Sequence, residues 1–146
     1  MQVEIKIDQS CTEPKVMIWT AAVTEEVNRI LDKLSENTPR ILTGVKNEKI
    51  EVIEQGDLIR VYAQAGKVLA VTGKGEYTVR IRLYEIEERL NPGQFVRISN
   101  SEIINLKKVK NFDLSFTGTI CVELVNGMTT YVSRRYVSKV KKILGI

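Results

Sequence analysis

The chain has 146 residues, of which 43% are hydrophobic and 27% are charged, and its formal net charge is +4. This length and composition fit one small domain, or one domain with a short extension, and exclude a multi-domain enzyme and a disordered protein. Histidine is absent, which removes the commonest general base and most zinc and iron ligand sets. We therefore expect a protein that is not an enzyme and that holds no metal or cofactor.

The N-terminus, MQVEIKIDQS, lacks the basic start and the continuous apolar run of a signal peptide. The apolar runs of the chain are far shorter than the roughly 20 residues that span a bilayer. These features predict a cytoplasmic protein without membrane insertion. Cys11 and Cys121 lie outside any CxxC spacing, and we expect them to be reduced, buried thiols.

Positive charge is concentrated in the C-terminal part of the chain. Residues 94–146 hold nine Lys and Arg against three Asp and Glu, whereas residues 1–93 hold thirteen against fifteen. A basic surface suits a negatively charged partner, nucleic acid before membrane, although many solvated helices carry as much charge.

Residues 1–39 predict a short extension of strands and one helix. Val3, Ile5 and Ile7 alternate with charged residues, which indicates a half-buried strand, and residues 16–19 predict a second one. Trp19 is interpreted as a core anchor. After Thr24, a predicted N-cap, apolar residues follow at the spacing of an amphipathic helix that ends near Asn37. These apolar positions are Val27, Ile30, Leu31 and Leu34.

From residue 40 to residue 86, short β-branched runs alternate with turn sequences. The runs RILTGV, KIEVI, DLIRVYA, KVLAVT and EYTVRIRL are separated by KNE, QGD, QAG and GKG. This pattern predicts antiparallel strands joined by tight turns. The segment Gly73-Lys74-Gly75 lacks the complete phosphate-loop pattern, so we interpret it as a turn. A short helical turn is expected at residues 84–90, before Asn91-Pro92-Gly93.

The last third predicts strands at residues 95–99, 112–116, 119–125 and 128–132, with Phe95 as a core anchor. The segment NSEIINL is polar and is assigned no strand. Asn126-Gly127 is a hairpin signal, since both residues accept the positive φ of a type I′ turn. Ser133 is the predicted N-cap of a final helix with an apolar stripe of Val137, Val140 and Leu144.

Two clusters combine basic residues with amides and hydroxyls. Lysine and arginine neutralise phosphates, and arginine and asparagine also pair with guanine and adenine edges in a major groove. The alternative interpretation is an ordinary turn, in which Ser and Asn bond to nearby backbone groups and the lysines cover an exposed face. The first cluster consists of Arg97, Ser99, Asn100, Ser101, Asn105, Lys107, Lys108 and Lys110.

The second cluster is the segment from Tyr131 to Tyr136, which contains Arg134 and Arg135 at a predicted strand-to-helix junction. An exposed helix N-terminus offers free N–H groups and a positive dipole end, and two arginines strengthen its attraction for phosphate. The alternative is a serine-capped helix whose tyrosines pack and whose arginines pair with carboxylates.

These two clusters, in this order and separated by a hairpin, resemble the LytTR family of bacterial response-regulator output domains. The segments that carry the resemblance are FVRISNSEIINLKKV and VELVNGMTTYVSRRYVSKVKK, and the match runs from about residue 40 to residue 146. The resemblance implies a mainly β fold (α+β overall) of small stacked antiparallel sheets with a short C-terminal helix, here preceded by the strand–helix extension. It also implies a sequence-specific transcriptional regulator whose loops enter successive major grooves of double-stranded DNA at paired direct repeats.

Carried over position by position, the resemblance points to Asn100 and Arg135 as base contacts. Lys67 is a weaker correspondence, because the loop before it is shortened. Ser99 stands where the family often has histidine. The residues expected to hold phosphates or to shape the loops are Arg97, Ser99, Ser101, Lys107, Lys108 and Arg134.

The residues before this module are too few for a receiver domain, so we expect a one-component regulator. The extension, residues 1–39, is expected to mediate a homodimer or to dock a protein partner through its helix, while residues 40–146 bind DNA. The alternative function is a small protein-interaction module with an incidentally basic C-terminus, which requires an exposed apolar patch. A nucleic-acid-processing enzyme would require a cleft with clustered carboxylates.

Overall fold

The computed structural model describes residues 1–34 and 41–146, and the chain divides into two compact units, residues 1–38 and 39–146. The predicted helix end near Asn37 and the predicted boundary between residues 39 and 40 fall outside the described residues. Within the described ranges, no helix is both long enough and apolar enough to cross a bilayer.

The first unit contains helix α1 (Glu25–Leu34), which confirms the predicted amphipathic helix. The Thr24 hydroxyl accepts a hydrogen bond from the Val27 N–H at 3.4 Å, as its predicted N-cap role requires. The two predicted strands are wrong, because residues 1–24 contain no strand. Ile5 is 90% exposed, and Trp19, the predicted core anchor, is 89% exposed. An alternating segment forms a strand only when another strand pairs with it.

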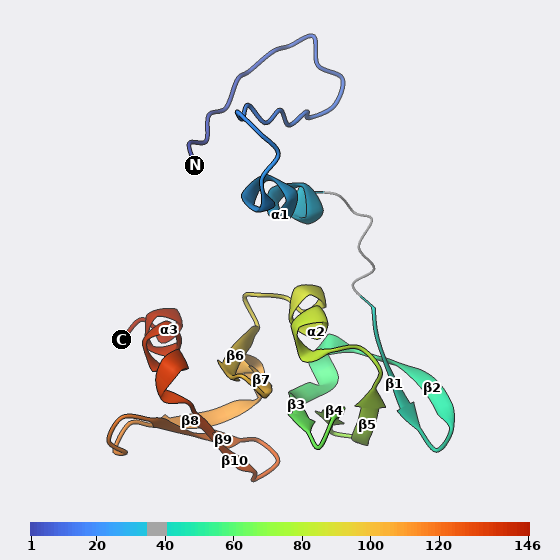
Figure 1. The fold of residues 1–146 in the computed structure, drawn as a ribbon, viewed down its shortest axis with the longest axis vertical. Helices are drawn as coiled ribbons and strands as arrows, with labels where there is room; N and C mark the ends of the chain where they lie inside the picture. The colour runs from blue at the N-terminus through green and yellow to red at the C-terminus, as the bar shows by residue number, and fades with distance from the viewer. Residues whose placement is uncertain (35–40) are drawn as a thin grey trace. The chain divides into compact units, whose positions relative to one another are not determined.

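The second unit is built on two antiparallel sheets (Figure 1). The large sheet has the strand order β2-β1-β5-β4-β3-β7-β6, and the small sheet has the order β10-β9-β8. This architecture confirms the predicted mainly β fold; among the strands, only β7 has no counterpart in the prediction. The strands are β1 (Leu42–Lys46), β2 (Lys49–Ile53), β3 (Leu58–Gln64), β4 (Lys67–Thr72), β5 (Gly75–Val79), β6 (Phe95–Ser99), β7 (Glu102–Asn105), β8 (Val109–Asp113), β9 (Ile120–Leu124) and β10 (Thr129–Val132).

Two helices and two 3₁₀ turns complete the second unit. Helix α2 (Leu83–Arg89) lies between β5 and β6 in the chain, and helix α3 (Arg134–Leu144) follows β10, both as predicted. The 3₁₀ turns span Gln55–Asp57 and Leu106–Lys108. In Figure 1, α2 lies beside the large sheet and α3 lies beside the small sheet.

The hairpin turns follow the backbone preferences of their residues. Asn47-Glu48 and Ala65-Gly66 both have the positive φ pair that a type I′ turn requires. The Asn126-Gly127 hairpin also forms, but its predicted turn type is wrong, because only Gly127 has a positive φ. The Gly127 N–H donates to the Leu124 carbonyl at 3.0 Å, so a type I turn followed by a left-handed glycine closes this hairpin. Gly73-Lys74-Gly75 joins β4 to β5, as expected for a turn.

The large sheet is buried on both faces at β7, whereas its outer strand β2 is mostly exposed. One face packs with α2 in a cluster that includes Leu83, Ile103 and Phe95, which confirms Phe95 as a core residue. The other face packs with the small sheet and α3 in a second cluster that includes Ile104 and Val140. Neighbouring residues of β7 therefore enter different cores, and all four residues of this strand are buried. A strand buried on both faces shows no polar alternation, which explains why it was not predicted.

The cysteines differ from the prediction. Cys11 is exposed and Cys121 is half-buried, and both are free thiols. The expectation that both are buried is therefore wrong.

We predict that Gly44→Ala destabilises the second unit by about 1 to 3 kcal/mol, because overpacking a close contact forces its neighbours apart. A Cβ at this position would lie 2.5 Å from the Tyr77 Cβ and 2.7 Å from the Ile53 Cδ1. The measurement is the free energy of unfolding by chemical denaturation. Gly56→Ala is the control, since nothing lies within 4 Å of its added Cβ. Equal stability of the two variants would contradict the close approach of β1 to β5.

Candidate nucleic-acid interface

The turn between β6 and β7 holds the candidate base-contact residue Asn100 at an exposed position. The Arg97 side chain bonds to the backbone carbonyls of this turn and holds its shape. Its Nε donates to the Ser99 carbonyl at 2.7 Å, and one Nη donates to the Asn100 carbonyl at 2.6 Å. The other Nη forms an ion pair with Glu87 at 2.7 Å, and the Arg97 side chain is only 15% exposed. The geometry therefore supports a loop-shaping role for Arg97 rather than a phosphate contact.

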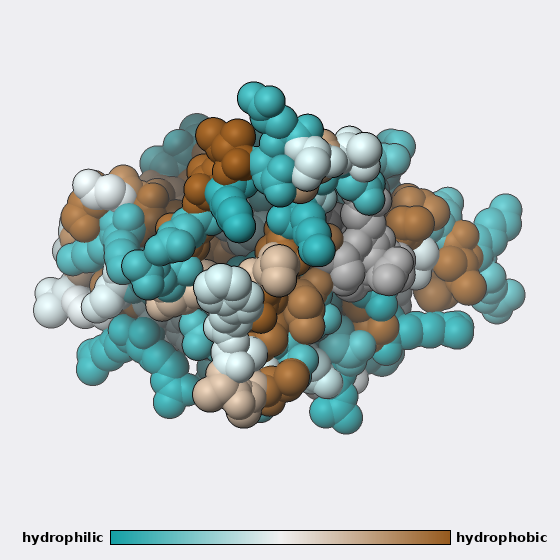
Figure 2. Space-filling view, turned by 90° about the horizontal axis from the view of Figure 1, so that it is seen from above, coloured by the Kyte–Doolittle hydropathy of each residue, from teal (hydrophilic) through white to brown (hydrophobic). Residues whose placement is uncertain are grey.

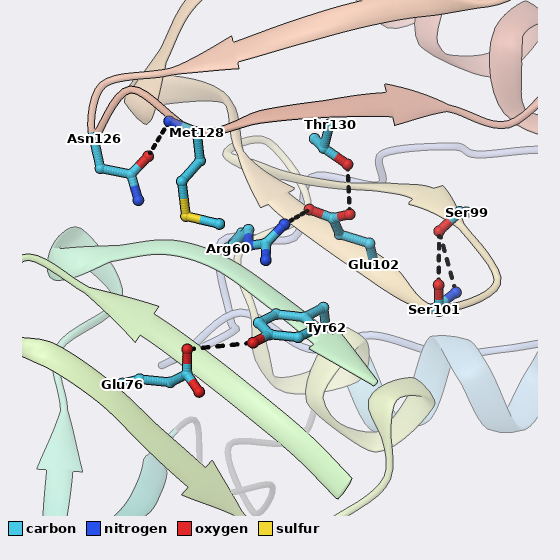
Figure 3. Close-up of polar contacts among 9 residues, drawn as sticks. All are labelled: Arg60, Tyr62, Glu76, Ser99, Ser101, Glu102, Asn126, Met128 and Thr130. Atoms are coloured by element: carbon cyan, nitrogen blue, oxygen red, sulfur yellow. Dashed lines mark hydrogen bonds and ion pairs between the residues drawn. The ribbon is translucent and has the colours of Figure 1, made fainter. Parts of the chain in front are cut away.

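The two serines of the turn bond to one another and to the neighbouring strand. The Ser99 hydroxyl accepts from the Ser101 N–H at 3.2 Å and lies 3.3 Å from the Ser101 hydroxyl (Figure 3). The Ser101 carbonyl accepts from the Ala63 N–H of β3 at 2.8 Å. These bonds fix the turn on the sheet and leave the Asn100 side chain at its apex.

A direct contact joins the two sequence clusters. The Tyr136 hydroxyl, on α3, donates to the Asn100 Oδ1 at 3.1 Å, across 36 positions of sequence. The backbone is also connected, since the Ser133 N–H donates to the Ile98 carbonyl of β6 at 2.9 Å. The structure thus brings the β6–β7 turn next to the start of α3.

Arg134 and Arg135 are exposed in the first turn of α3. Ser133 occupies the predicted N-cap position, but its side chain makes no capping hydrogen bond, so that part of the prediction is wrong. Val140 anchors the helix in the core, and Gly145 ends it with a left-handed φ of 74°. Burial of one face of α3 therefore holds both arginines toward solvent.

Lys67 lies exposed at the start of β4, directly after the Ala65-Gly66 turn. The bond from Ala63 to Ser101 shows that this end of β3 lies beside the β6–β7 turn. The structure therefore places Lys67 and Asn100 at the same end of the strands of the large sheet. It gives no direct contact between these two side chains.

Asn105 is not part of the exposed cluster. It is fully buried, its Nδ2 donates to the Leu58 carbonyl at 2.7 Å, and its Oδ1 accepts from the Lys107 N–H at 2.9 Å. Its interpretation as a DNA-reading amide is therefore wrong, and its role is structural. Lys107 is exposed, Lys108 is half-buried, and Lys110 lies 3.7 Å from Glu123.

A buried carboxylate behind the candidate turn joins the two sheets (Figure 3). Glu102, the first residue of β7, forms an ion pair with Arg60 of β3 at 3.1 Å. Its other oxygen accepts from the Thr130 hydroxyl of β10 at 2.6 Å. The Glu102 and Arg60 side chains are 11% and 12% exposed. Sequence reasoning missed this group, although a glutamate beside two isoleucines is a signal of an inward-facing charge.

The network continues along β3 to a tyrosine. The Arg60 guanidinium lies 4.2 Å from the centroid of the Tyr62 ring, whose hydroxyl donates to Glu76 at 3.2 Å. Burial raises the pKa of Tyr62 above its usual value, and the nearby Glu76 carboxylate raises it further. The hydrogen bond to Glu76 and the raised pKa both favour the neutral phenol as the donor.

This β-rich module places an exposed amide and two exposed arginines on a turn and a helix start that contact one another. The family model for the LytTr DNA-binding domain matches residues 48–145, and the chain belongs to the LytTR family. This is a DNA-binding family and not an enzyme class.

The fold is that of a solved LytTr domain. The LytTr DNA-binding domain of a putative methyl-accepting/DNA response regulator from Bacillus cereus superposes with a TM-score of 0.70 at 23% identity. The match covers 73% of this chain and 97% of that one.

Curated relatives match over the whole chain. An uncharacterized HTH-type transcriptional regulator of Staphylococcus aureus strain NCTC 8325 is 30% identical over 147 residues, which cover 100% of this chain and 99% of the relative. The corresponding protein of strain MRSA252 is 29% identical over the same length. In the part of this chain that the structure describes, strands separate the three helices, so a helix-turn-helix is not formed there.

We predict that Glu102→Ala destabilises the second unit by about 3 kcal/mol, because it leaves Arg60 buried without its counter-charge. Glu123→Ala is the control, since it removes a carboxylate from an exposed pair with Lys110 and from an exposed hydrogen bond with Asn111 at 2.8 Å, and it costs about 1 kcal/mol. Urea denaturation measures both values. A loss for Glu102→Ala no larger than that of the control would show that the buried pair does not hold the sheets together.

Proposed function

We propose that this protein is a sequence-specific, one-component transcriptional regulator whose loops read successive major grooves, with the β6–β7 turn and the start of α3 reading bases in the same groove. The observation that carries the proposal is the Tyr136–Asn100 hydrogen bond, which sets an exposed amide beside two exposed arginines. Membership of a DNA-binding family supports the same conclusion.

In this proposal the residues divide by exposure and by existing partners. Asn100 and Arg135 read base edges, and Lys67 makes a further base contact from the β3–β4 turn. Side chains that position the protein on phosphates are Arg134, Lys107 and Lys108. Those that shape the turn are Arg97, Ser99 and Ser101, whose polar groups are already bonded within it.

The proposed partner is double-stranded DNA carrying paired direct repeats, with one copy of the chain on each repeat. A regulator of this kind acts in the compartment that holds the chromosome, so the proposal places the protein in the cytoplasm.

The proposal is tested by fluorescence-anisotropy binding to the DNA upstream of the protein's own gene, against scrambled DNA, at two salt concentrations. Tight binding that survives scrambled competitor and weakens steeply with salt is expected, because several phosphate contacts release counterions. Equal weak binding to this DNA, to scrambled DNA and to pooled genomic fragments would contradict sequence-specific reading. It would favour the interaction-module alternative.

We predict that Arg135→Ala costs roughly 1 to 3 kcal/mol of operator affinity and relaxes base discrimination, because a base-edge contact is lost. Lys107→Ala is the comparison. It is expected to weaken operator and scrambled DNA equally and to lower the salt slope by about one, because it removes a phosphate contact. Anisotropy titrations on both DNAs measure these effects. Equal, sequence-independent losses for the two variants would refute the division of roles.

We predict that Tyr136→Phe weakens operator binding about three- to tenfold, the usual worth of one hydrogen bond. The ring stays, but Asn100 loses the hydroxyl that orients its amide. Binding to scrambled DNA and the free energy of unfolding are expected to change little. Tyr84→Phe, at a tyrosine of α2 that is 56% exposed, is the control. Unchanged operator affinity in Tyr136→Phe would show that this bond does not position Asn100 for recognition.

A further inference from the structure

The first unit exposes much apolar surface and has little core of its own. Helix α1 contains no buried residue, although Leu31 and Leu34 belong to its apolar stripe and are 47% and 52% exposed. Trp19 and Val23 are 89% and 74% exposed. Figure 2 shows hydrophobic residues reaching the surface between hydrophilic ones on the face that it draws.

A unit of this size rarely folds on its own. Below about 40 residues, a chain usually needs a disulfide, a metal or association with another chain to become stable. Cys11 is the one cysteine of residues 1–38, so a disulfide within the unit is impossible. Association with another chain is the solution that fits an exposed apolar stripe.

The charges of α1 indicate which chain covers the stripe. Its first turn is acidic, with Glu25 and Glu26, and its last turn is basic, with Lys33. Glu26 and Lys33 are two turns apart on the same side of the helix, next to the stripe, and both are exposed. In an antiparallel pair of identical helices, each Glu26 faces the Lys33 of the other copy, whereas a parallel pair places the two copies of Glu26 on opposite sides of the interface and forms no such contact.

We propose that the first unit is a self-association element, in which α1 pairs antiparallel with α1 of a second copy of this chain. The stripe of Val27, Ile30, Leu31 and Leu34 then becomes the core of the dimer. This goes beyond the proposed function, because it assigns a partner to residues outside the DNA-binding domain.

The residues before α1 suit the same interface. The Cys11 N–H donates to the Asp8 carbonyl at 3.2 Å, and the Ser10 N–H donates to the Asp8 side chain at 3.0 Å, so a turn is formed here. It connects two segments, residues 3–7 and 16–19, that have strand-like sequences but no strand partner. A second copy supplies a partner for such segments, as exposed strand edges commonly acquire.

The test is sedimentation equilibrium of the full chain without DNA, on two single variants and on their mixture. Glu26→Lys and Lys33→Glu each place like charges across the antiparallel pair, and each is expected to weaken the dimer about tenfold, from two altered contacts per dimer. An equimolar mixture is expected to recover wild-type affinity, because every contact in the mixed dimer joins opposite charges. An effect on helix stability alone cannot recover on mixing. Glu25→Lys is the control: it makes the same charge change on the side of α1 away from the stripe. It breaks the exposed pair with Arg29 at 3.9 Å within the helix, so any loss of affinity acts through the helix, and mixing with Lys33→Glu is not expected to restore wild-type affinity.

Trp19, the single tryptophan of the chain, provides a second readout. Its emission is expected to shift to shorter wavelength as protein concentration rises, because the dimer covers it. A monomer at all concentrations up to about 100 μM, or a dimer whose affinity none of these variants changes, would overturn the proposal. Because the test uses no DNA, its failure leaves the proposed function intact, and failure of operator binding leaves the dimer intact.

Discussion

The buried carboxylate of Glu102 is the constraint on which the candidate interface depends. It binds Arg60 in the large sheet and Thr130 in the small sheet. These two contacts fix the position of one sheet relative to the other at this point. Glu102 follows the β6–β7 turn directly, and Thr130 lies in β10, the strand that precedes α3 in the chain. A shift of either sheet would therefore break a buried, charge-assisted contact, which is costly at low solvent exposure. The position of the turn relative to the start of α3 follows from this contact and from the Tyr136–Asn100 bond.

Most strands were predictable because they alternate between a core face and a solvent face. The hairpin of β9 and β10 is an example, since its inward residues Ile120, Val122 and Leu124 are buried at every second position. Strand β7 was not predictable in this way, because Ile103 and Ile104 enter different cores. The opposite error occurred at residues 3–7, where alternation is present and no strand forms. Alternation reports that a segment can form a strand, and a pairing partner decides whether it does.

The sequence predicted where the candidate site lies, but it did not predict which of its side chains are buried or already hydrogen-bonded. Asn100 and Arg135 were identified by resemblance, and the structure leaves both exposed. Arg97 and Asn105 are of the same residue types as Arg135 and Asn100, yet Arg97 is bonded to the turn and Asn105 is buried. Local sequence does not distinguish these cases, since Glu87, the ion-pair partner of Arg97, is ten positions away and Leu58, the partner of Asn105, is 47 positions away. The same holds for Tyr136, whose bond to Asn100 spans 36 positions.

The central claim is that two connected loops of this domain, the β6–β7 turn and the start of α3, read base edges in a major groove. Dimethyl sulfate footprinting of the bound operator tests it directly, because the reagent methylates guanine N7 in the major groove and adenine N3 in the minor groove. The account predicts protection of guanine N7 at the operator repeats, with part of that protection lost in the Arg135→Ala complex. Protection confined to adenine N3, or a guanine pattern that Arg135→Ala leaves unchanged, would contradict it.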